Sequence, residues 1–113
     1  MNKMVKLEAL IAWPPTSKCR EMIAVLEEVV RRYPDRVKLV VFERGMREYR
    51  EKPSAAMAAL IHKGSLVPVC LVDGALVCRS QVPTLEDLEA KVQEALRGWY
   101  NSLSQEETLG DVK

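Results

Sequence analysis

The chain changes from strand to helix at Trp13-Pro14-Pro15-Thr16-Ser17-Lys18-Cys19. The apolar run from Val5 to Ala12 predicts a short buried strand, because it is mostly apolar and ends at two prolines. The helix that follows exposes unpaired N–H groups and the positive end of its dipole at its start, and both favour a thiolate over a thiol. Cys19, with Thr16 three residues before it, is therefore the first candidate for a chemically active residue.

The composition indicates one compact domain. The chain has 113 residues, 48% of them hydrophobic, which suffices for a modest core. Its 17 Lys and Arg nearly balance 16 Asp and Glu, so we expect neither nucleic acid nor a membrane as a partner. No apolar run approaches the roughly 20 residues that span a bilayer. Three cysteines without disulfide-scaffold spacing, and an N-terminus unlike a signal peptide, predict a cytoplasmic protein.

The first half of the chain predicts a strand–helix–strand unit. Apolar residues recur at helical spacing from Cys19 to Tyr33, with charged residues between them, and Pro34 stops the helix. The β-branched run Val37 to Phe42 predicts a second strand, parallel to the first through a right-handed crossover. The charged segment 43–52 that follows is either a solvated surface connection or a recognition patch for an acidic partner.

The second half predicts a short helix, a hairpin and a final helix. Ser54 and Gly64 are the expected N-cap and terminator of a helix over residues 55–62. Thr84 is the expected cap of the last helix. The buried stripe of that helix is predicted at Leu85, Leu88, Val92, Leu96 and Trp99. We place the domain at residues 1–100 and expect a frayed polar tail over 101–113.

The hairpin allows a prediction about the other two cysteines. Strands 69–72 and 75–78 flank Asp73-Gly74, a favoured two-residue turn. With this turn Cys70 pairs with Val77, and Cys78 lies one residue further along. Because neighbouring residues of a strand point to opposite faces, Cys70 and Cys78 should project from opposite sides of the sheet. We therefore expect no disulfide between them and interpret both as packed thiols.

Together, the element order and three short motifs resemble the thioredoxin-like superfamily, in the form of glutaredoxins and small archaeal thioredoxins. Cys19 to Glu28 is similar to the helix after the second cysteine of a thioredoxin C-x-x-C motif. Val67-Pro68 resembles the family's cis-proline loop, and Asp73-Gly74 its hairpin turn. The resemblance implies an α/β thioredoxin-like fold, β-α-β-α-β-β-α, with a four-stranded mixed sheet flanked by helices. It also implies a cis Val67–Pro68 bond.

Carried over to this chain, the resemblance places Thr16 at the family's attacking cysteine and Cys19 at its resolving cysteine. A threonine hydroxyl cannot replace the thiolate that starts disulfide exchange, so the ordinary dithiol cycle is not expected. Three interpretations of Cys19 remain open: a packed core thiol, a reactive monothiol, or a metal or metalloid ligand. Trp13, Pro15, Val67 and Pro68 are the residues we expect to line a substrate groove.

Other chemistry is not indicated. His62 is the single histidine, and nothing in the sequence places a nucleophile beside it, so we interpret it as a surface residue at a helix end. The chain contains no Gly-rich phosphate loop, no HExxH motif and no Ser-His-Asp set, and we expect no cofactor and no metal.

The leading hypothesis for function is a thioredoxin-like or glutaredoxin-like protein with a monothiol role at Cys19. A protein thiol or a small thiol such as glutathione would then be its partner. The alternative hypothesis is a non-catalytic binding module on the same scaffold. The oligomeric state stays open, as does the question of whether the chain is an enzyme.

Overall fold

The computed structural model describes residues 4–46 and 48–112, which form helices and strands in the predicted order. The elements are β1 (Val5–Ile11), α1 (Ser17–Arg32), β2 (Val37–Glu43), α2 (Ala55–Lys63), β3 (Val69–Val72), β4 (Ala75–Arg79) and α3 (Leu85–Val112). The order β-α-β-α-β-β-α is thereby confirmed.

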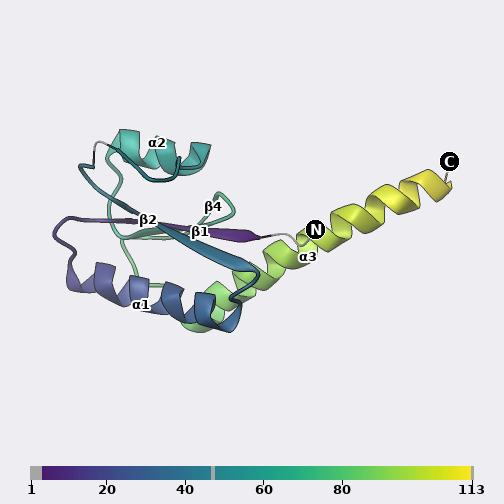
Figure 1. Cartoon of the computed structure of the whole chain (residues 1–113), viewed down its shortest axis with the longest axis horizontal. Coiled ribbons are helices and arrows are strands. Elements are labelled where there is room, and N and C mark those ends of the chain that lie inside the picture. Colours follow the sequence, from purple (N-terminus) through teal and green to yellow (C-terminus); the bar gives the residue numbers. More distant parts are fainter. Residues whose placement is uncertain (1–3, 47, 113) are drawn as a thin grey trace.

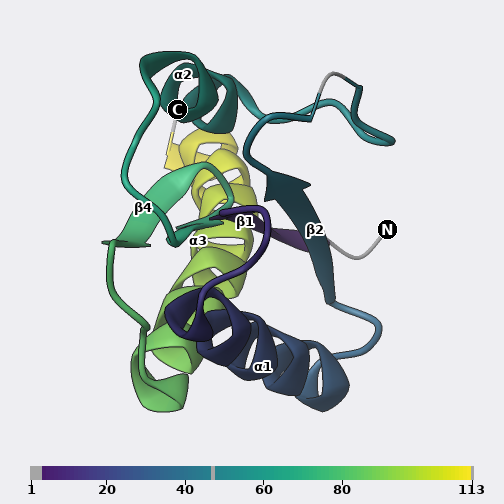
Figure 2. The ribbon, with the colours of Figure 1, turned by 90° about the vertical axis from the view of Figure 1, so that its left-hand side faces the viewer.

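The described strands form one mixed sheet in the order β2-β1-β3-β4. β1 and β2 run parallel, from Val5 opposite Val37 to Ile11 opposite Glu43, and α1 is the connection between them. β3 runs antiparallel to both β1 and β4. In Figure 2, β2 and β4 lie at the two edges of the sheet with β1 between them. The parallel pair confirms the prediction from the strand–helix–strand unit.

Helices cover both faces of the sheet. α1 and α3 pack on one face and α2 packs on the other (Figure 1). Because side chains alternate along β1, Leu7 and Ala9 join the core under α1 and α3, whereas Leu10 joins the core under α2. The first core is the larger, and the helices contribute to it Cys19, Met22, Leu26, Val29, Leu88, Val92 and Leu96.

The predicted helix caps and turn are present. The Ser54 hydroxyl oxygen accepts the N–H of Met57 at 3.1 Å, and the Thr84 hydroxyl oxygen accepts the N–H of Asp87 at 3.1 Å. These bonds satisfy N–H groups that the first helical turn leaves unpaired. The helix terminator and the hairpin turn adopt left-handed backbone, at Gly64 (φ 72°), Asp73 (φ 48°) and Gly74 (φ 82°).

The β3–β4 hairpin contains a bulge that changes the pairing of its cysteines. The register shifts between Leu71 and Cys70, so that Cys70 lies opposite Cys78 and Val77 is the extra residue. Our prediction that the two cysteines project from opposite faces is therefore wrong. The physical reason is packing, because the bulge lets the consecutive side chains of Val77 and Cys78 both pack against the core under α1 and α3.

Glu8 is a buried carboxylate in the central strand. Its side chain is 1% exposed, and its Oε2 accepts the N–H of Ser54 at 2.9 Å. Ser54 caps α2, so the carboxylate lies at the positive end of that helix dipole. The contact joins β1 to the start of α2, and the sequence showed Glu8 only as an interruption of an apolar run.

The charged segment between β2 and α2 packs back onto the domain. The Tyr49 ring meets Phe42 edge-on, with centroids 5.2 Å apart. The Glu51 carboxylate pairs with Lys38, and it also lies 4.0 Å from the ammonium group of Lys6. Arg47 lies outside the described residues. These contacts agree with the interpretation of segment 43–52 as a surface connection. The alternative, a recognition patch for an acidic partner, stays a prediction.

α3 extends further than the sequence suggested. Leu88, Val92 and Leu96 are buried as predicted, while the side chain of Trp99 lies outside the part that the structure describes. The helix continues to Val112, beyond the body of the domain, where we expected a frayed tail (Figure 1). The stretch 101–109 contains no proline or glycine that would stop a helix. The domain boundary at residue 100 stays a prediction.

Candidate functional site

Thr16 and Cys19 contact each other at the start of α1. The Thr16 hydroxyl oxygen accepts the N–H of Cys19 at 3.2 Å and so caps the helix. The same hydroxyl donates to Cys19 Sγ, also at 3.2 Å. Thr16 is exposed, whereas Cys19 is 0% exposed. A residue with a short hydroxyl side chain, three residues before the thiol, is what the contact requires.

Two opposing effects act on the ionisation of Cys19. Burial raises the pKa of its thiol, because a thiolate is poorly solvated inside the protein. Hydrogen bonds from the Thr16 hydroxyl and from the backbone of Ala12 and Thr16, together with the charge of Arg20, lower the pKa and outweigh burial. The thiol is thus easier to ionise than an ordinary one, while its sulfur is closed to solvent.

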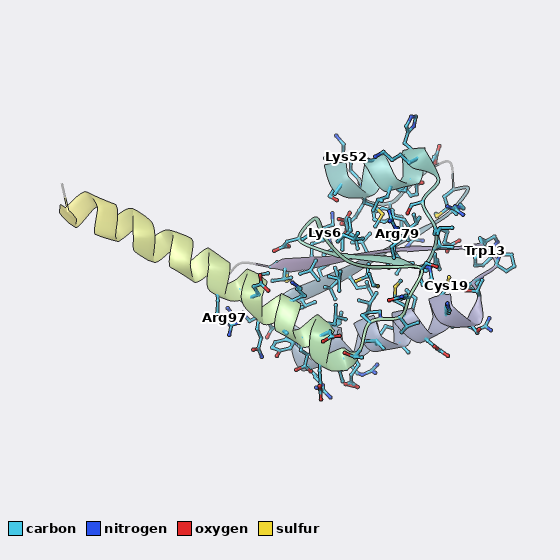
Figure 3. The ribbon with its side chains drawn as sticks, turned by 180° about the vertical axis from the view of Figure 1, so that it is seen from behind. Lys6, Trp13, Cys19, Lys52, Arg79 and Arg97 are labelled. Carbon is cyan, nitrogen blue, oxygen red and sulfur yellow. The ribbon has the colours of Figure 1, made fainter. Side chains whose placement is uncertain are left out.

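The predicted substrate-binding residues before α1 face different surroundings. Trp13 is 66% exposed and extends outward at the end of the molecule where α1 begins (Figure 3). Pro15 is half-buried and lines an open groove of about 350 Å³ between α1 and β2. The other residues that line this groove are Ile11, Arg20, Ile23, Glu27 and Val41. Trp13, Val67 and Pro68 do not line this particular groove, and a substrate groove formed by all four residues stays a prediction.

The loop before β3 is tied to the start of α1 through Ser80. The Val67–Pro68 peptide bond is cis, as is Trp13–Pro14. Pro68 is buried, and its carbonyl oxygen accepts the N–H of Ser80 at 2.7 Å. The Ser80 carbonyl oxygen in turn accepts a hydrogen bond from Lys18 Nζ at 3.4 Å. These bonds connect the Pro68 loop with the first turn of α1, one residue from Cys19.

Cys70 and Cys78 form a second thiol cluster that our reading of the sequence missed. Cys70 lies opposite Cys78 in the strand register, and both thiols are free. The neighbouring Cys78 thiol and burial raise the pKa of Cys70, while interaction with Cys70 holds the pKa of Cys78 below its ordinary value. The only sequence signal for this pair was a cysteine in each strand of the hairpin, because no sequence motif marks the position of the bulge.

The remaining candidates stay peripheral. His62 is exposed near the end of α2. Within residues 4–46 and 48–112, no three His, Cys, Asp or Glu side chains gather where they could hold a metal ion. No helix in the same described ranges is long and apolar enough to cross a bilayer.

The comparison with solved structures defines the class of fold, which is thioredoxin-like. A structure of thioredoxin-2, described as a component of the protein secretion machinery of the malaria parasite, matches this chain with a TM-score of 0.56. The match covers 83% of this chain and 85% of that chain, at 14% sequence identity. Identity this low shows the fold alone. No family model matches the sequence, and no curated protein matches it.

Proposed function

We propose that this chain is a thioredoxin-fold binding protein, related to thiol–disulfide redox proteins, without a dithiol reductase cycle at the start of α1. One observation carries the proposal: the thiol at this motif, Cys19, is 0% exposed, and the exposed position before it is Thr16. Disulfide exchange begins with attack by an accessible thiolate. A hydroxyl cannot start that reaction, and a buried sulfur cannot reach an incoming disulfide.

The surface around the α1 start suits a peptide or protein partner in a reducing, cytoplasmic setting. Trp13 offers a large exposed ring, and the exposed side chains of Thr16, Ser17 and Lys18 follow it. Aromatic side chains supply much of the contact area at binding surfaces, and a polar rim supplies hydrogen bonds. The Thr16–Cys19 contact then serves to hold the first turn of α1 in place.

The electrostatics of Cys19 favour a second candidate, a monothiol role. The Thr16 hydroxyl bond at 3.2 Å holds the pKa of the thiol down against burial, which is how reactive thiols are prepared. A protein thiol or a small thiol such as glutathione would be the partner in that case. The reaction would require the first turn of α1 to open and expose the sulfur.

Alkylation separates the two candidates. The native protein is treated with iodoacetamide over a pH series, and modification of each cysteine is followed by peptide-resolved mass spectrometry. For the binding protein we expect Cys19 to react at least about tenfold more slowly than in the urea-unfolded chain, because its thiol must wait for local opening. Modification as fast as in the unfolded chain, with a midpoint below that of an ordinary thiol, would instead support the monothiol role.

A further inference from the structure

The β3–β4 hairpin brings two thiols together across neighbouring strands. Cys70 and Cys78 are direct partners in the antiparallel register. Such partners have Cα atoms about 4.5–5.5 Å apart, which lies inside the range that a disulfide spans. Because direct partners on antiparallel strands share a face, both side chains project from the same side of the sheet, and both pack in the core under α1 and α3.

We propose that Cys70 and Cys78 are a second thiol site of this protein, one that closes reversibly into a disulfide across the hairpin when it meets a small disulfide oxidant such as oxidised glutathione. The site is separate from the Thr16–Cys19 contact, since it lies on β3 and β4. It is a site of covalent modification, and it does not depend on the binding function proposed for the α1 start.

The surroundings assign a different role to each cysteine. Cys78 is half-buried on β4, the edge strand of the sheet, so an oxidant can reach its sulfur. Cys70 is 0% exposed on β3, between β1 and β4, and can reach only a sulfur that is already inside the protein. Interaction with the Cys70 thiol and backbone lowers the pKa of Cys78, which favours the attacking thiolate. Cys78 is therefore the attacking residue and Cys70 the resolving residue.

The reaction proceeds in two exchanges. The Cys78 thiolate attacks one sulfur of the oxidant, the S–S bond of the oxidant breaks, and one thiolate leaves with the electron pair and takes up a proton. Cys70 then loses its proton to the solvent and attacks Cys78 Sγ, which expels the second thiol. In total, two electrons and two protons pass from the protein to the oxidant. One S–S bond forms across the hairpin and one breaks in the oxidant.

The experiment uses the full chain in its folded, reduced form with oxidised glutathione as the probe. After acid quenching, free thiols are alkylated in denaturant and the protein is digested with trypsin. Both cysteines lie in the tryptic fragment 64–79, since Lys63 and Arg79 bound it. We expect this fragment to escape alkylation and to be lighter by two hydrogen atoms. Cleavage before Asp73 should leave its two halves joined until a reductant is added.

Single substitutions test the assigned roles. Cys70→Ser should stop the reaction at a mixed disulfide between Cys78 and glutathione, and Cys78→Ser should abolish modification of the hairpin. Cys19→Ser, the matched control, should leave the hairpin disulfide unchanged. Since Cys70 is buried, Cys78→Ser alone decides the question if Cys70→Ser does not fold.

Three results would overturn the proposal. The first is a wild-type fragment that stays reduced when the folded protein meets oxidised glutathione, while the urea-unfolded chain is modified. The second is a wild-type glutathione adduct on Cys78 that Cys70 never resolves. The third is a disulfide that persists in Cys78→Ser, because Cys19 would then be the partner of Cys70. None of these results depends on how Cys19 itself reacts with iodoacetamide, so the two proposals fail separately.

Discussion

Cys19 and Cys70 are both fully buried thiols in the same core, and they differ in the group that meets each sulfur. The sulfur of Cys19 accepts a hydrogen bond from the Thr16 hydroxyl, one helical turn away. Cys70 instead lies opposite the thiol of Cys78 on the neighbouring strand. A hydroxyl partner can change the ionisation of a thiol but cannot form a covalent bond with its sulfur. A thiol partner can also be oxidised together with it to a disulfide.

The redox site that we propose on the hairpin therefore lies away from the start of α1, where thioredoxins carry their C-x-x-C motif. In this chain the start of α1 has hydrogen bonds that favour a thiolate, but it has one sulfur instead of two. The hairpin has both sulfurs, and one of them, Cys78, lies at the edge of the sheet.

The largest expected effect comes from adding the missing sulfur. Thr16→Cys recreates C-x-x-C at the start of α1, where the helix dipole should lower the pKa of the exposed new thiol and Cys19 can resolve a mixed disulfide. Wild-type protein should show no catalysis above background in disulfide reduction with a thioredoxin-type reductant. The variant should show measurable turnover and a disulfide between residues 16 and 19.

Thr16→Ser is the matched control, because it keeps a capping hydroxyl and adds no sulfur. It should remain inactive. Turnover by wild-type protein would contradict the expectation that the unmodified α1 start is inactive. If this turnover is lost in Cys78→Ser, the activity belongs to the hairpin. If Thr16→Cys neither oxidises nor turns over, residues 16 and 19 do not share a thioredoxin-like arrangement.

The next effect tests the core that both thiols share. Leu26 is fully buried in the middle of α1, so Leu26→Ala should leave a cavity and lower the free energy of unfolding by roughly 2–5 kcal/mol. Glu27, its exposed neighbour, is the control, and Glu27→Ala should cost about 0.5 kcal/mol or less. Urea denaturation measures both, and the opposite ranking would contradict the assigned face of α1.

These contacts differ in how far the sequence could predict them. The Thr16–Cys19 contact joins residues three apart at a helix start, so a local pattern was sufficient. The same holds for the caps at Ser54 and Thr84 and for the buried stripe of α1. The parallel pairing of β1 and β2 followed from the length of the crossover alone.

The features that were missed depend on packing between distant segments. The bulge at Val77 exists because two consecutive side chains of β4 fit the core under α1 and α3, and a turn sequence carries no information about that fit. The Glu8 carboxylate finds its partner, the N–H of Ser54, 46 positions along the chain.

The smallest effect concerns the hydroxyl on Cys19. Thr16→Ala removes the cap of α1 and the bond to the sulfur together. Loss of the cap should lower the free energy of unfolding by about 1 kcal/mol. Loss of the hydrogen bond should raise the pKa of Cys19, because burial then acts against fewer stabilising contacts. Thr16→Ser retains the hydroxyl and should differ little from wild type in both measurements.

The pH dependence separates the two consequences of Thr16→Ala. In wild-type protein the pKa of Cys19 is lower in the folded chain than in the unfolded chain, so the unfolded chain binds more protons between these two values. Stability therefore rises with pH through that interval, and the contribution is lost as pH falls through the folded pKa. Thr16→Ala should flatten this rise, measured by urea denaturation against Cys19→Ser as a reference without the thiol. An unchanged slope would mean that the hydroxyl caps the helix and leaves the ionisation of Cys19 alone. Cys19 and Cys70 would then differ only in whether a second thiol lies beside the sulfur.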